Sequence, residues 1–131
     1  MRGELTNPTT LTFTRAVNNP VGGGNNDVEI AWFAVTLNDG TIVQKGTTTV
    51  NAGLMDVPLV PIVLNRSFPI VSVSGGTDVL NTHLDDTSLT DAFTSTTNLR
   101  LQRANTAVPA TAAWFVVNLG SPRIDWQEII P

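Results

Sequence analysis

Apolar and polar residues alternate in short runs along this chain, which is typical of β-strands rather than helices. In residues 9–16 the alternation places Leu11 and Phe13 on one face. No stretch of ten or more residues has the apolar spacing of an amphipathic helix. Further strands are predicted at Val28–Leu37, Thr41–Val50, Val57–Leu64, Pro69–Ser74, Ser95–Ala104 and Thr111–Leu119, with Ile124–Ile130 as a last strand or an arm. The pattern therefore predicts an all-β fold, an antiparallel β-sandwich of about eight short strands in one domain, 1–131.

Two turn signals refine this arrangement. The sequence Asn38-Asp39-Gly40 favours a hairpin turn between Val28–Leu37 and Thr41–Val50. Proline cannot donate a hydrogen bond to a β-ladder, so Pro58 and Pro61 predict that Val57–Leu64 is an edge strand.

The chain also contains an internal repeat. The segment LTNPTTLTFTRA (5–16) aligns with FTSTTNLRLQRA (93–104), and in each copy a loop is followed by a Trp segment, AWFAVTL (31–37) or AWFVVNL (113–119). Beyond each Trp segment, Val43-Gln44 resembles Trp126-Gln127. Two matches in the same order favour duplication, with repeat-related halves of about 1–53 and 54–131.

The halves would pair in one of two ways. Packing face to face within one chain gives a pseudo-symmetric sandwich and leaves fewer open strand edges, which favours it. Alternatively, the incomplete first unit completes itself on another subunit.

The strand pattern of the second half resembles that of H-type lectins. The resemblance is carried by Phe68-Pro69-Ile70-Val71-Ser72-Val73, by Leu99–Leu101 and by Ala113-Trp114-Phe115-Val116-Val117. It is also similar to β-repeat units with a terminal Trp strand in phage tail and other virion surface proteins. This resemblance implies a six- to eight-stranded antiparallel sandwich that often forms trimers. The sugar-contacting residues of such lectins have no match here.

Composition and charge narrow the class of partner. The net charge is −4, with only 7 scattered basic residues, which argues against nucleic acid and against an anionic membrane surface. The chain has no cysteine, so a disulfide framework is excluded. The start, MRGELTNPTT, lacks the apolar core of a signal peptide. A virion protein released by lysis would need no such signal, so we expect a virion-surface or extracellular location.

The residues that carry chemistry do not form a catalytic set. His83 is the only histidine, and the Gly-x-Ser-x-Gly elbow of a hydrolase is missing. Gly22-Gly23-Gly24 lacks the Lys-Ser/Thr of a phosphate loop and is interpreted as a flexible loop. We therefore expect no enzyme and no cofactor. Ca²⁺ is a minor alternative at the acidic residues Asp78, Asp85, Asp86 and Asp91, whose spacing matches no calcium loop.

Two repeat-related pairs and one apolar segment are candidate contact residues. Trp32 and Trp114 are expected to pack in the core, with sugar stacking as the alternative. Arg15 and Arg103, each closing a Thr-rich strand, are expected to form surface ion pairs, line a ligand groove or meet a neighbouring subunit. The segment 124–130 is either a strand on the sandwich or an arm that docks elsewhere. It supplies the remaining candidate contacts, Ile124, Trp126, Ile129 and Ile130.

Together these observations favour a non-catalytic structural protein of a viral surface, such as a capsid decoration protein or a tail component. It would self-associate, as a trimer in the favoured case, and bind a capsid or tail protein. The alternatives are a glycan-binding module resembling H-type lectins and a subunit of an extracellular filament.

Overall fold

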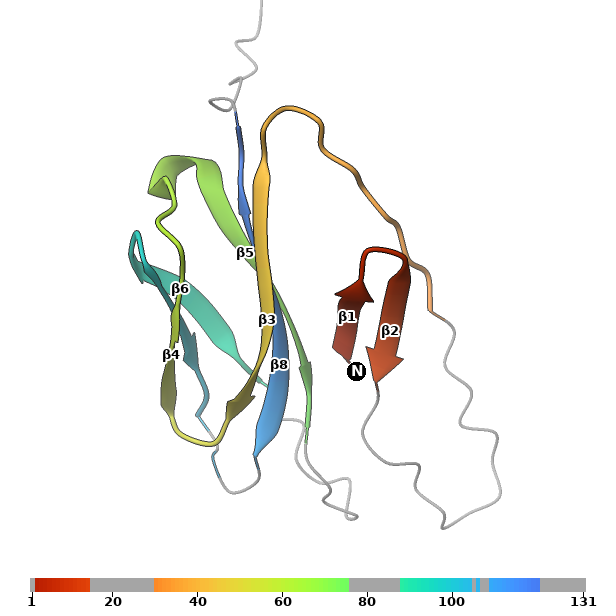
Figure 1. Ribbon diagram of the computed structural model, residues 1–131. Coiled ribbons are helices and arrows are strands. Elements are labelled where there is room, and N and C mark those ends of the chain that lie inside the picture. Colours follow the sequence, from red (N-terminus) through yellow and green to blue (C-terminus); the bar gives the residue numbers. More distant parts are fainter. Residues whose placement is uncertain (1, 15–29, 76–87, 105, 107–108, 121–131) are drawn as a thin grey trace, which may run out of the picture.

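The computed structural model describes residues 2–14, 30–75, 88–104, 106 and 109–120. Over these ranges the chain consists of β-strands and a single 3-10 turn. The elements are β1 (Arg2–Asn7), β2 (Thr10–Thr14), β3 (Ile42–Val50), β4 (Leu54–Pro58), η1 (Leu64–Arg66), β5 (Ser67–Ser74), β6 (Thr90–Ser95), β7 (Asn98–Gln102) and β8 (Ala110–Asn118). The strands form three antiparallel sheets, ordered β1-β2, β3-β8-β5 and β4-β7-β6. The predicted all-β fold is confirmed, and its layers are consistent with a β-sandwich (Figure 1).

The hydrophobic core lies between the two three-stranded sheets. Leu99 and Leu101 of the central strand β7 are fully buried, as their alternation predicts. Val116 of β8 faces them from the other sheet, and Val50 and Val57 close the core from β3 and β4. Strand β8 is central in its own sheet, its inner face packs in the core, and its nearly continuous apolar sequence also gives it an apolar outer face.

A nine-residue ladder joins β3 to β8, from Ile42 opposite Asn118 to Val50 opposite Ala110. Within it Gly46 lies opposite Trp114, and the indole ring covers the glycine. The ring is partly buried against the core, and its Nε1 donates to Thr48 Oγ1 at 3.1 Å. The expectation that Trp114 packs in the core is confirmed.

An ion pair joins β4 to β7 in the β4-β7-β6 sheet. Asp56 of β4 lies opposite Arg100 of β7, and its two carboxylate oxygens accept from Nε at 2.9 Å and Nη2 at 3.0 Å. Asn98 Nδ2 also donates to Asp56. The hydrogen bonds from Arg100 and then from Asn98 lower the pKa of Asp56 from 3.8 to about 2.

The two repeat-related hairpins have the same structure. Each β6–β7 residue corresponds to a β1–β2 residue 88 positions earlier, from Thr90 and Arg2 at one end to Gln102 and Thr14 at the other. The cross-strand pairs and the position of the register shift coincide under this offset. The turns agree as well: Asn7 Oδ1 accepts from Thr9 N–H at 2.9 Å, and Ser95 Oγ accepts from Thr97 N–H at 3.1 Å. This part of the predicted repeat is confirmed.

The Trp segments of the repeat, in contrast, differ. Residues 30–37 of the predicted strand Val28–Leu37 form no strand, and Trp32 is 59% exposed rather than buried in the core. The predicted turn is present, since Gly40 has a φ of 80° and Asp39 Oδ1 accepts from Thr41 N–H, but it does not join two strands. Strand β3 pairs instead with β8, and its other edge has no partner strand among the described residues.

Several strand bounds also differ from the prediction. The edge position of β4 is confirmed, but the strand ends at Pro58 instead of Leu64. The chain then leaves the ladder, and Leu59 and Ile62 donate backbone hydrogen bonds to Thr97 and Thr96 while their side chains enter the core. Strands β1 and β6 were not predicted because their sequences, RGELTN and TDAFTS, are mostly polar.

Nor do the repeat halves each build one layer of the sandwich. Strand β3 belongs to the first half by sequence, yet it pairs with β8 of the second half. The β1–β2 hairpin lies outside the core, against the face of the β3-β8-β5 sheet that points away from β4, β6 and β7 (Figure 1). The preferred prediction of two halves packed face to face is therefore wrong for the part of the chain that the structure describes.

Candidate functional site

The outer face of the β3-β8-β5 sheet is organised in cross-strand rows. One row consists of Thr47, Ala113 and Ser72, and the β1–β2 hairpin covers it. Two further rows continue along the same face, Lys45-Phe115-Ile70 and Val43-Val117-Phe68. Side chains opposite each other in a ladder share a face, so these rows form one continuous surface.

Strand β1 contacts this surface through its backbone edge. Ser72 Oγ accepts from Gly3 N–H at 3.2 Å and donates to Gly3 C=O at 3.1 Å. Ala113, in the same row, is fully buried beneath the hairpin, and its small side chain permits this close approach.

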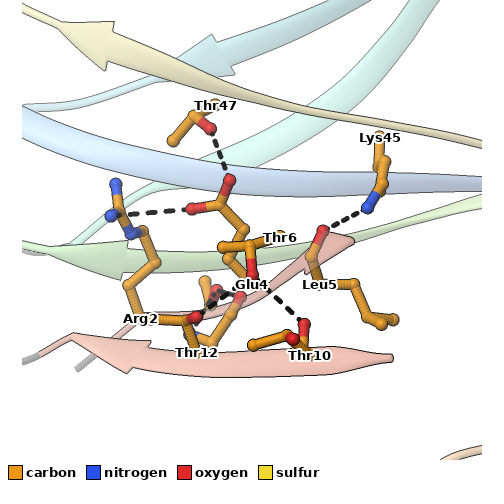
Figure 2. Close-up of polar contacts among 10 residues, drawn as sticks. Arg2, Glu4, Leu5, Thr6, Thr10, Thr12, Lys45 and Thr47 are labelled. Carbon is orange, nitrogen blue, oxygen red and sulfur yellow. Dashed lines mark hydrogen bonds and ion pairs between the residues drawn. The ribbon is translucent and has the colours of Figure 1, made fainter. Parts of the chain in front are cut away.

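Two side chains of β3 also contact β1. Thr47 Oγ1 donates to Glu4 Oε1 at 3.0 Å, and Lys45 Nζ donates to Leu5 C=O (Figure 2). Arg2 lies on the other side of Glu4, with an Nη2 to Oε2 distance of 3.6 Å. The hairpin is thus fixed to the sheet by polar contacts with the Thr47-Ala113-Ser72 row and, through Lys45, with one end of the next row.

The hairpin itself is amphipathic. Its polar face carries a threonine network in which Thr6 Oγ1 bonds Thr12 Oγ1 at 3.2 Å (Figure 2). Its apolar face carries Leu5, Leu11 and Phe13, the counterparts of Phe93, Leu99 and Leu101. Whereas Leu99 and Leu101 are fully buried, Leu5 and Phe13 remain 40% and 37% exposed. The first hairpin therefore has core-type residues without a complete core.

An apolar groove lies beside the hairpin, over the two uncovered rows. Its volume is about 980 Å³. The floor is formed by Phe68, Ile70, Phe115, Val117 and Val43, one wall by the hairpin tip (residues 5–8), and the other by Val35 and Leu37, with Leu119 at the rim. Phe68, Ile70 and Val43 are 44%, 53% and 50% exposed. Contiguous exposed apolar surfaces occur at protein–protein interfaces and in ligand-binding grooves.

The chemistry available in the groove is limited. Its polar lining residues are Thr6, Asn7 and Lys45, and the ammonium of Lys45 is engaged by Leu5 C=O. Among the described residues, no three His, Cys, Asp or Glu side chains come together as metal ligands. The lining is therefore suited to burying apolar side chains.

Of the two candidate arginines and the candidates in 124–130, only Arg103 lies in the described part of the chain. Its side chain is 3% exposed, and Nη1 donates to Val50 C=O at 2.7 Å while its backbone N–H donates to Gly53 C=O at 2.9 Å. Arg103 thus joins the end of β7 to the β3–β4 turn inside the fold, and its side chain is buried rather than on the surface. Arg15, Ile124, Trp126, Ile129 and Ile130 lie outside the described residues, so their predicted contacts stay predictions.

Of the acidic residues considered for Ca²⁺, Asp91 lies in the described part of the chain. Burial raises the pKa of its carboxyl group. Asp78, Asp85, Asp86, His83 and Gly22-Gly23-Gly24 fall outside the described ranges. In these ranges there is also no helix long and apolar enough to cross a membrane.

The groove residues were not singled out by the sequence, although a signal was present. Strand β5 reads Phe68-Pro69-Ile70-Val71, which is apolar at successive positions. An edge strand with one wet face alternates, so an unbroken apolar run indicates that its second face also has a partner.

Comparison with protein-family models, with curated proteins and with solved structures finds no match to this chain. The resemblance to H-type lectins and to virion β-repeats therefore stays a prediction, and the site has to be interpreted from its own geometry.

Proposed function

We propose that this protein is a non-catalytic assembly protein whose copies associate through the apolar groove. The observation that supports this most directly is the uncovered half of the sheet face: the hairpin covers the Thr47-Ala113-Ser72 row, while the neighbouring apolar rows stay open. A sheet face that carries Phe and Ile at about half exposure gains free energy when another chain removes it from water.

The class of assembly is the viral surface component expected from the sequence, a capsid decoration protein or a tail component. The threonine-rich β composition, the repeat and the resemblance to virion β-repeats support that setting. The glycan-binding alternative has less support from the groove, because sugar recognition needs convergent polar groups and the lining offers few.

The test is the mass of the protein in solution by light scattering over a hundredfold range of concentration. Ile70 is 53% exposed in the groove, so Ile70→Glu adds a charge to the proposed interface without entering the core. Val60 is 69% exposed and does not line the groove, so Val60→Glu is the matched control.

We expect the parent protein and Val60→Glu to form the same oligomer, a closed trimer in the favoured case, and Ile70→Glu to be monomeric. A parent protein that stays monomeric throughout, or an Ile70→Glu variant with unchanged mass, overturns the proposal. Circular dichroism of both variants confirms that the sandwich is retained.

A further inference from the structure

The segment Ala31–Leu37 has the sequence of a central strand but no partner strand within the described ranges. It shares five of seven residues with AWFVVNL of β8, as AWFAVTL. In β8, Val117 is 7% exposed, whereas its counterpart Val35 is 78% exposed. Phe33, in the same segment, is 90% exposed. Residues of this kind at this exposure indicate a surface that another strand covers.

The pairing of β3 indicates which strand that is. Strand β3 follows the first Trp segment in sequence but pairs with the second, β8. The counterpart of β3 is the segment 124–130, because Val43-Gln44 and Trp126-Gln127 occupy the same place in the repeat. By the same rule, the segment 124–130 would pair with the first Trp segment, Ala31–Leu37.

We infer that copies of this protein associate by strand exchange, with the segment 124–130 of one copy pairing with Ala31–Leu37 of a second copy and filling its groove. This inference rests on the proposed function, since it names the part of the second copy that enters the groove. Transferring the β3–β8 register to the repeat predicts the pairs. Trp126 takes the place of Val43 and would lie opposite Val35, the counterpart of Val117. Glu128 takes the place of Lys45 and would lie opposite Phe33, the counterpart of Phe115.

The register directs apolar side chains into the groove. Val35 and Leu37 line it, and cross-strand neighbours share a face, so Trp126 and Ile124 lie over the groove floor. One difference follows from the sequence: Ile129, not glycine, lies opposite Trp32, so Trp32 cannot lie across the partner strand as Trp114 lies across Gly46.

The starting point of the segment permits exchange. Gly120 packs against Asp39 and Gly40, and its N–H donates to Thr41 Oγ1 at 3.3 Å, so the chain leaves β8 at the groove rim. The same contacts can therefore form within one copy or between two, which is the condition for strand exchange. Head-to-tail exchange closes into a ring, such as a trimer, when the rotation between copies permits it, and otherwise forms a filament.

Cysteine cross-linking tests the pairing, because the native chain contains no cysteine. Equal amounts of a Val35→Cys variant and a differently tagged Trp126→Cys variant are mixed, assembled and oxidised. The control replaces Trp126→Cys by Gln127→Cys, which shifts the thiol by one residue to the opposite strand face. Phe33→Cys with Glu128→Cys is a second test pair, chosen because Phe33 is 90% exposed and its replacement leaves the fold intact.

We expect a covalent dimer of the two tagged chains with Trp126→Cys and loss of that product with Gln127→Cys. An oligomer that Ile70→Glu disrupts, but in which neither test pair cross-links, overturns the strand exchange and leaves the proposed function standing. A double variant Val35→Cys/Trp126→Cys that cross-links only within one chain also overturns it, because the groove is then occupied by the chain's own segment. A protein that is monomeric at all concentrations overturns the proposed function itself.

Discussion

The contact between Gly46 and Trp114 leads to a quantitative prediction for Gly46→Ala. A Cβ atom on Gly46 would lie 2.4 Å from Cζ2 and 2.9 Å from Cε2 of the indole ring. Carbon atoms in proteins are normally about 3.5–4.0 Å apart. The ring therefore has to move by roughly 1 Å, or β3 and β8 have to separate.

Three terms set the size of the effect. Overpacking a well-filled site costs about 1–3 kcal/mol. Displacing the ring also weakens the 3.1 Å hydrogen bond to Thr48, a loss of about 1 kcal/mol. Alanine is better suited than glycine to a strand interior, and this returns about 0.5–1 kcal/mol. We expect the free energy of unfolding to fall by about 2 kcal/mol and the melting temperature by roughly 5–10 °C.

Urea unfolding followed by circular dichroism measures this difference. Gly53→Ala is the control, since a Cβ there would lie 3.7 Å from Arg103 C=O, an ordinary contact distance. The control should leave stability unchanged or raise it by about 0.4–1 kcal/mol. If Gly46→Ala unfolds at the same urea concentration as the parent and the control, the account of the Gly46–Trp114 contact is wrong.

Two further predictions concern the stability contributed by the core and by the Asp56–Arg100 ion pair. Leu99→Ala should lower the free energy of unfolding by about 3–5 kcal/mol. Its repeat counterpart Leu11 is half-buried in the hairpin, so Leu11→Ala should lower it by only about 1 kcal/mol. Equal losses for the two variants in urea unfolding would mean that the hairpin belongs to the core. Because Asp56 has a pKa of about 2 instead of 3.8, its contribution to stability is present above pH 3.8 and is lost as the pH falls toward 2. Asp56→Asn should therefore lose less stability over that range, and parallel melting-temperature curves for the two proteins would contradict this.

The elements that the sequence predicted well are those with a local signal. The alternation of Leu99 and Leu101 marks β7, because the face of a strand follows directly from a period of two. The continuous apolar run around Trp114 marks β8. Pro58 marked an edge strand correctly, since a missing N–H excludes a central position.

The groove shows where local signals are insufficient. The repeated sequence predicts the same strand at 31–37 and at 113–119, yet only the second forms one in the described structure. The two segments have similar strand propensity, but β3 pairs with β8 and not with 31–37, and no local signal indicates that choice. Likewise, Arg103 looks like a surface residue in sequence, and only the turn formed by Val50 and Gly53 shows that it is buried.

The sequence by itself determined the all-β class, the faces of the main strands and the repeat of 5–16 at 93–104, whose two copies share a register and a turn 88 residues apart. These features depend on interactions between residues close in sequence, so they are written into each local segment. The tertiary structure decided that the first hairpin covers only one row of the β3-β8-β5 sheet and leaves an apolar groove beside it. That outcome depends on which segments compete for the same sheet, and such competition is settled only when distant parts of the chain meet.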